Sequence, residues 1–68
     1  MSSKLKGYRV MAGATQADMS RILGYSSQQA YGQKEIGRNS FKLEEMKVIR
    51  DYLNSKLNKA LTMDDIFA

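Results

Sequence analysis

The segment from Thr15 to Gly37, TQADMSRILGYSSQQAYGQKEIG, constrains the fold of this chain more than any other part of it. Its first half has the pattern of a short helix. Thr15 is a candidate N-cap, and Asp18 lies three residues later, near the positive end of the helix. Four apolar residues then recur at helical spacing: Ala17, Met19, Ile22 and Leu23. Gly24 supplies the positive φ that stops the helix, so we expect a tight turn to follow it.

The second half of the segment predicts another short helix, which begins with a pair of glutamines. Ser26 or Ser27 is its candidate cap, and Ala30 and Tyr31 can turn inward. The glutamines that face outward are Gln28, Gln29 and Gln33. A glutamine amide presents a donor and an acceptor side by side, which matches the N6 and N7 edge of adenine in the major groove of DNA. The segment therefore predicts a helix-turn-helix that reads DNA.

The N-terminal residues predict a further helix. Ser2 or Ser3 can cap it, and it is expected to run to about Ala12, where Gly13 ends it. Its apolar face holds Leu5, Tyr8 and either Met11 or Ala12. Tyr8 and Tyr31 are both expected in the core, with their hydroxyls near the surface.

The C-terminal residues predict a long helix and a short one. After a loop at residues 36–40, apolar residues recur at 3- and 4-residue spacing. They are Leu43, Met46, Ile49, Tyr52 or Leu53, and Leu57. Residues 54–60 either extend this helix or form a loop. Thr62 and Asp65 predict a last helical turn that presses Ile66 and Phe67 into the core. Because Asp64 and Asp65 diverge at a helix start, they indicate helix-end stabilisation and not a metal or catalytic site. The expected fold is all-α, with four or five short helices in one domain over residues 1–68.

The composition argues against several classes of function. The 68 residues include no cysteine and no histidine, so the chain lacks disulfides, thiolates, the usual zinc ligands and the commonest acid–base residue. No apolar run approaches the roughly 18 residues of a membrane span, and no signal-peptide core is present. We therefore expect a soluble cytoplasmic protein that is not an enzyme and that takes no cofactor, metal or small-molecule ligand.

The net charge of +4 is unevenly distributed along the chain. Residues 1–42 hold seven basic and two acidic side chains, whereas residues 43–68 hold four basic and five acidic ones. The excess positive charge therefore lies in the same half as the predicted helix-turn-helix, as binding to a polyanion requires.

Nearly the whole chain resembles a known family. The matching stretches are LKGYRVMAGATQADMSRILG at residues 5–24, AYGQKEIGRNSF at 30–41 and LTMDDIF at 61–67. The arginine, the T-Q start, the L-G turn, the K-E-x-G exit and the D-D-I-F ending follow the order found in the Cro and repressor domains of lambdoid phages. The chain thus resembles this XRE-type helix-turn-helix family, and most of all the small Cro-like regulators of phages from Gram-positive hosts. The resemblance implies a lambda-repressor-like domain.

The resemblance also implies roles for residues at matching positions. Gln28 and Gln29 match the two positions that probe base edges, and Gln33 matches a further outward position near the groove. Gln16 matches a glutamine that packs on a phosphate and on the first glutamine of the reading helix. The loop after Gly37 matches a phosphate-contacting loop, in which backbone N–H groups and short polar side chains suffice. The residues of this loop are Arg38, Asn39, Ser40 and Lys42.

Other charged residues receive structural or general roles. Arg9 and Glu35 match a buried or half-buried ion pair that ties the first helix to the end of the third. We expect the remaining basic residues of this half to be solvated or to act through long-range attraction; they are Lys4, Lys6, Arg21 and Lys34.

The turn departs from the family pattern by one residue. After Gly24 the chain has five residues, YSSQQ, where the family usually has four. We place the extra residue in the turn, at Tyr25 or Ser26. If the helix absorbs it instead, the register rotates by about 100° and Ser27 becomes a base reader. Tyr25 itself either packs on the helices or lies against the sugar-phosphate backbone.

The expected function is a sequence-specific transcriptional regulator of Cro or repressor type, in the cytoplasm and on the host nucleoid. Its partner is a double-stranded DNA operator with an inverted repeat, bound by a homodimer whose contacts involve the fourth helix and the Leu57–Phe67 region. The alternative is a protein-binding module of the same fold, antitoxin-like or an anti-repressor partner, with weak or non-specific DNA binding. The lengthened turn favours this alternative, as does Gly32, which costs a free helix roughly 1 kcal/mol relative to Ala. Gly32 either permits close approach to the DNA backbone or leaves the helix partly disordered until DNA binds.

Overall fold

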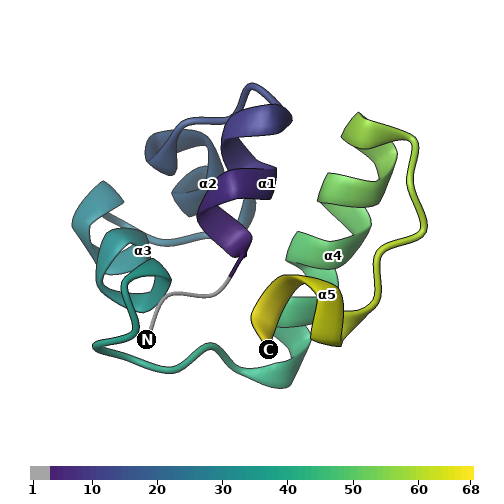
Figure 1. Ribbon diagram of the computed structural model, residues 1–68. Helices are drawn as coiled ribbons and strands as arrows, with labels where there is room; N and C mark the ends of the chain where they lie inside the picture. The colour runs from purple at the N-terminus through teal and green to yellow at the C-terminus, as the bar shows by residue number, and fades with distance from the viewer. Residues whose placement is uncertain (1–3) are drawn as a thin grey trace.

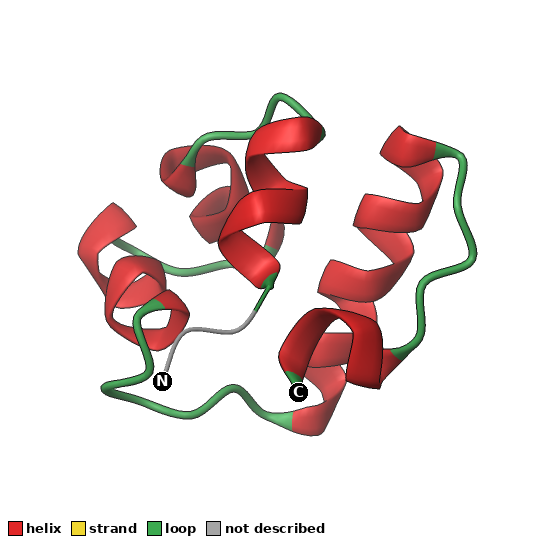
Figure 2. Ribbon diagram, in the orientation of Figure 1, coloured by secondary structure: helices red, strands yellow, loops and turns green. Residues whose placement is uncertain are grey.

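The computed structural model describes residues 4–68, which contain five helices and no strand. The helices are α1 (Leu5–Met11), α2 (Gln16–Ile22), α3 (Gln28–Glu35), α4 (Leu43–Leu57) and α5 (Met63–Phe67). In Figure 1, α2 and α3 lie on one side of α1, and α4 lies on the other side with α5 against it. Figure 2 shows that short loops join all the helices. The expected all-α fold is confirmed. Within residues 4–68 no helix is long and apolar enough to cross a membrane.

Capping boxes begin two of the helices, as the sequence predicts. At the start of α2 the Thr15 hydroxyl accepts from the Asp18 N–H (3.0 Å), and the Asp18 carboxylate accepts from the Thr15 N–H (2.9 Å). Thr62 and Asp65 form the same pair at the start of α5, at 3.1 and 2.8 Å. These contacts satisfy N–H groups that have no partner within the helix, and they place a carboxylate at its positive end.

The start of α3 settles one further capping prediction. Ser27 is the N-cap of α3, since its hydroxyl accepts from the Ala30 N–H (3.3 Å). The N-cap position of α1 is Lys4, which makes no side-chain capping bond. The predicted capping residues Ser2 and Ser3 lie outside the described residues. At the other ends of α1 and α2, Gly13 and Gly24 adopt φ values of 73° and 76°, as their predicted stop positions require.

The core forms where all five helices meet, and most of its members lie on the predicted apolar faces. Its buried hydrophobic residues are Leu5, Ala14, Met19, Tyr31, Ile49, Leu53 and Ile66. Aromatic rings continue this core, because Phe41 lies 5.9 Å from Tyr31 and 5.7 Å from Phe67, measured between ring centroids. Of the two alternatives at the end of the first helix, Ala12 at the C-cap of α1 packs against the core, whereas Met11 is 62% exposed.

Two details of the core differ from expectation. Leu43 is 61% exposed, because at 100° per residue it is rotated about 80° from Leu53 around the axis of α4. The Tyr31 hydroxyl is not near the surface, since the whole side chain is buried. It donates instead to the buried carboxylate of Glu35 (2.7 Å).

Of residues 54–60, the first four continue α4 to Leu57 and the last three form a loop, so each of the two alternatives holds for part of the segment. Asn58 ends the helix in the left-handed conformation (φ 53°). The Asn54 side chain then holds the loop, accepting from the Leu61 N–H (2.8 Å) and donating to the Leu61 carbonyl (3.1 Å). This contact returns the chain to the core at α5.

Candidate nucleic-acid interface

Helices α2 and α3 form a packed unit with a turn that is tied at both ends. The Tyr25 N–H donates to the Ser20 carbonyl (2.9 Å), and the buried Ser20 hydroxyl donates to the Ser27 carbonyl (2.7 Å). Tyr25 and Ser26 therefore lie in the turn, ahead of the Ser27 cap, and α3 begins at Gln28. This is the placement that keeps both leading glutamines on the helix.

The outer side of α3 carries the residues that the sequence proposes as base readers. Gln28 and Gln29 occupy the first turn of the helix and are exposed, while Gln33 is half-buried one turn later. Ser27 is exposed too, but its hydroxyl is used for capping. Tyr31 and Glu35 mark the buried side of the same helix, and Gln29 and Gln33 lie opposite to it. Gln28 lies about 60° from Tyr31 around the helix axis and is exposed at the start of the helix. Both leading glutamines are thus accessible to solvent on a helix whose buried side is fixed in the core.

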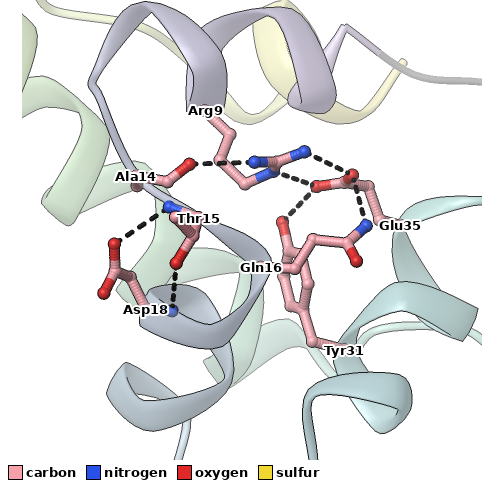
Figure 3. Close-up of polar contacts among 7 residues, drawn as sticks. All are labelled: Arg9, Ala14, Thr15, Gln16, Asp18, Tyr31 and Glu35. Atoms are coloured by element: carbon pink, nitrogen blue, oxygen red, sulfur yellow. Dashed lines mark hydrogen bonds and ion pairs between the residues drawn. The ribbon is translucent and has the colours of Figure 1, made fainter.

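A buried carboxylate, Glu35, joins the first three helices (Figure 3). Arg9 of α1 donates to it twice, from Nε (2.7 Å) and Nη2 (3.1 Å), and also donates from Nη1 to the Ala14 carbonyl (2.8 Å). Tyr31 donates its hydroxyl proton to Glu35 (2.7 Å), and Gln16 of α2 donates from Nε2 (3.2 Å). Arg9 and Glu35 are therefore the buried pair that the resemblance implies, with Tyr31 and Gln16 as additional partners.

The charges of this network are fixed by their surroundings. Burial opposes ionisation of Glu35, but the hydrogen bonds from Arg9, Tyr31 and Gln16 outweigh burial and hold the pKa of Glu35 below its ordinary value of 4.5. Burial, together with the hydrogen bond to Glu35, raises the pKa of Tyr31 well above 10. At neutral pH the site is therefore a carboxylate with a guanidinium and two neutral donors around it.

Gln16 contacts α3 through both ends of its amide group. Its nitrogen donates to Glu35, and its oxygen lies 3.3 Å from the place that a Cβ on residue 32 would occupy. Gly32 thus makes room for Gln16, a role that the sequence did not reveal. Glu35 uses one of the two amide protons of Gln16, which leaves the half-buried side chain with a second amide proton and its oxygen for any further contact.

The loop after α3 exposes the side chains that the sequence proposes as phosphate contacts. These are Arg38, Asn39, Ser40 and Lys42. The expectation that backbone N–H groups of this loop face phosphates is wrong for three of the four residues. Those of Arg38 and Asn39 donate to the Gln33 carbonyl (2.9 and 3.3 Å), and that of Lys42 donates to Glu45 (2.9 Å). The reason is that the free carbonyls at the end of α3 and the capping carboxylate of α4 need these donors. Phosphate contacts from these three residues would therefore come from side chains.

A second polar cluster, formed by Tyr25, Lys34 and Glu45, was not predicted. The Tyr25 hydroxyl donates to Glu45 (2.5 Å), so Tyr25 packs on the helices. Lys34 Nζ also contacts Glu45 (3.1 Å) and lies 4.8 Å from the centre of the Tyr25 ring. The expectation of a solvated Lys34 is wrong, since its side chain is only 19% exposed. The spacing of Lys42 and Glu45 indicates a helix start. The local sequence does not show that Tyr25 and Lys34, from other elements, bond to the Glu45 carboxylate.

The other basic residues are distributed as expected. Lys4 and Lys6 are exposed, and Arg21 forms an exposed pair with Asp18 (3.1 Å). In residues 4–68 no group of three acidic, histidine or cysteine side chains is placed to hold a metal ion.

A comparison of the chain with protein-family models, with curated proteins and with solved structures gives no match.

Proposed function

We propose that this chain is a sequence-specific, cytoplasmic DNA-binding regulator of Cro or repressor type. The observation that carries the proposal is the pair of exposed glutamines, Gln28 and Gln29, on the first turn of α3. Amide side chains at this place can bind base edges in the major groove, and an adenine edge suits them best. The Glu35 network supports the proposal because it holds the back of the same helix in one orientation.

Phosphate contacts would come from the loop after α3 and from the start of α2. The exposed side chains of Arg38 and Lys42 lie in the loop after α3, and Gln16 lies at the start of α2. A single domain of this size makes few contacts, so we propose that a homodimer binds an inverted repeat. Its half-sites would lie about 34 Å apart, one turn of the DNA helix.

Replacement of both glutamines tests the proposal. Gln28→Ala with Gln29→Ala should abolish the preference for the operator over a scrambled duplex, because the proposed base contacts are lost. Both side chains are exposed, so their removal should not affect the fold. Thermal unfolding followed by circular dichroism should be unchanged, and gel-shift titrations measure the preference.

Arg38→Gln is the matched control, because it removes an exposed charge from the loop and not from the reading helix. It should weaken binding to the operator and to the scrambled duplex alike, and lower the salt dependence by about one phosphate contact. Retention of the operator preference by the double glutamine variant would refute the assignment.

A protein-binding module of the same fold is the second candidate. Ile36, directly after α3, is 56% exposed. An exposed apolar side chain at this place suits an apolar protein partner better than a phosphate backbone. The same titrations separate the candidates, since this module would bind DNA weakly and without sequence preference.

A further inference from the structure

Glu45 receives hydrogen bonds from three separate parts of the chain. One carboxylate oxygen accepts from the Tyr25 hydroxyl, and the other accepts from the Lys34 ammonium (3.1 Å) and from the Lys42 N–H (2.9 Å). Its side chain is only 17% exposed. Tyr25 lies in the turn before α3, Lys34 lies on α3, and Lys42 ends the loop after α3. A residue of α4 therefore joins both flanks of the helix that carries the exposed glutamines.

These bonds keep Glu45 ionised. Burial raises its pKa, but the bonds from Tyr25, from the Lys42 N–H and from Lys34 outweigh burial and leave the pKa below 4.5. The Glu45 carboxylate forms an ion pair with the Lys34 ammonium, which also lies over the Tyr25 ring. Lys34 is thus held against the protein, although it belongs to the same helix as the proposed base readers.

We propose that Glu45 is a positioning residue for DNA recognition, which fixes the turn before α3 and the loop after it relative to one another and withholds Lys34 from the phosphates. This inference rests on the proposed function. Glu45 itself need not touch DNA. Its effect is on specificity, because base readers and phosphate contacts must be presented together for one register on the duplex to be favoured.

The test compares Glu45→Ala with Glu44→Ala. Both residues lie in the first turn of α4 and both changes remove one negative charge, but Glu44 is exposed. The readout is the ratio of operator affinity to scrambled-duplex affinity, measured at a temperature at which both variants are folded. Glu45→Ala should lower this ratio by about tenfold or more, as much as the loss of one base contact. It should also raise the salt dependence by about one phosphate contact as Lys34 is released, and Glu44→Ala should keep the wild-type ratio.

Glu45→Gln separates the two parts of the inference. The glutamine oxygen can still accept from the Lys42 N–H while its amide nitrogen donates to the Tyr25 hydroxyl, but the side chain does not hold Lys34 by charge. This variant should recover part of the specificity ratio while its raised salt dependence remains. A ratio equal to that of wild type in Glu45→Ala would overturn the inference and leave the proposed function standing.

Amide hydrogen exchange tests the coupling of the two flanks without DNA. The N–H groups of Tyr25, Arg38 and Asn39 donate to acceptors other than Glu45, so they serve as probes. They should exchange faster in Glu45→Ala than in Glu44→Ala, and equal rates would overturn the inference even if no operator were found. If Glu45→Ala does not fold, Tyr25→Phe is the substitute, because it removes only the hydroxyl that donates to Glu45. The backbone N–H at position 25 should then exchange faster than in wild type. An unchanged rate would overturn the inference.

Discussion

Glu35 shows how one residue can hold three helices together. It lies at the end of α3 and is 6% exposed, and its two oxygens accept from Arg9 on α1, Gln16 on α2 and Tyr31 on its own helix. Among the described residues, no buried side-chain nitrogen or oxygen is left without a hydrogen-bond partner. Loss of any one partner would leave a buried charge or dipole uncompensated, which costs more than the net value of the bond itself.

Arg9→Ala should therefore destabilise the fold. Removal of the guanidinium leaves the Glu35 carboxylate buried without its counter-charge, so we expect the free energy of unfolding to fall by about 3–5 kcal/mol. Urea unfolding measures this, with Arg21→Ala as the control. Arg21 pairs with Asp18 at the surface, and its loss should cost less than about 0.5 kcal/mol. Unchanged stability of Arg9→Ala with weakened DNA binding would mean that Arg9 contacts phosphate and that its structural role is wrong.

The Glu35 network also predicts a loss of stability in acid. Because the pKa of Glu35 in the folded state lies below its ordinary value of 4.5, the stabilisation is complete above that pH. It is lost as the pH falls through the lowered folded-state pKa. Unfolding free energies measured from neutral pH downward should decline in this range, and the decline should be smaller in Glu35→Gln. The carboxylates of Asp18, Glu45 and Asp65 titrate in both proteins, so the difference isolates Glu35. The same decline in both proteins would contradict this assignment.

At the scale of the elements, helix starts and stops were predictable because they depend on neighbouring residues. Thr15 and Thr62 each meet an aspartate three residues on, and Gly13 and Gly24 have the backbone freedom that a helix end needs. The role of Gly32 was not predictable, because it depends on Gln16 from another helix. The same holds for Tyr25 and Lys34, whose common partner Glu45 is on α4.

Gly32→Ala should stabilise α3. A Cβ at this position would lie 3.3 Å from the Gln16 amide oxygen, so the Gln16 side chain must shift by a few tenths of an ångström while its amide nitrogen stays bonded to Glu35. Alanine gains up to about 1 kcal/mol over glycine within a helix. We therefore expect a net gain of about 0.5 kcal/mol in thermal unfolding experiments.

The same substitution in a Gln16→Ala background is its control. There the contact is absent, and the full gain should appear. A loss of stability in the wild-type background would contradict the expectation, and recovery in the Gln16→Ala background would assign that loss to Gln16.

At the scale of the whole molecule, helix periodicity and capping residues were sufficient to predict an all-α fold and most of the buried faces of its helices. Ile49, Leu53 and Ile66 bring α4 and α5 onto the same core as Leu5 and Met19. The sequence could not show that α4 also supports both flanks of α3 through Glu45, since that contact exists only after the helices have packed. The candidate interface thus depends on the whole fold and not on the helix-turn-helix alone.

We propose that the exposed face of α3 recognises a DNA sequence. Selection of bound duplexes from a random library by the purified protein, followed by sequencing, tests this most directly. We expect enrichment of an inverted repeat whose half-sites lie about one helical turn apart, with positions that lose their preference in the Gln28→Ala, Gln29→Ala variant. Salt-sensitive binding without any enriched sequence would contradict it, because only the electrostatic attraction of a basic surface would then remain.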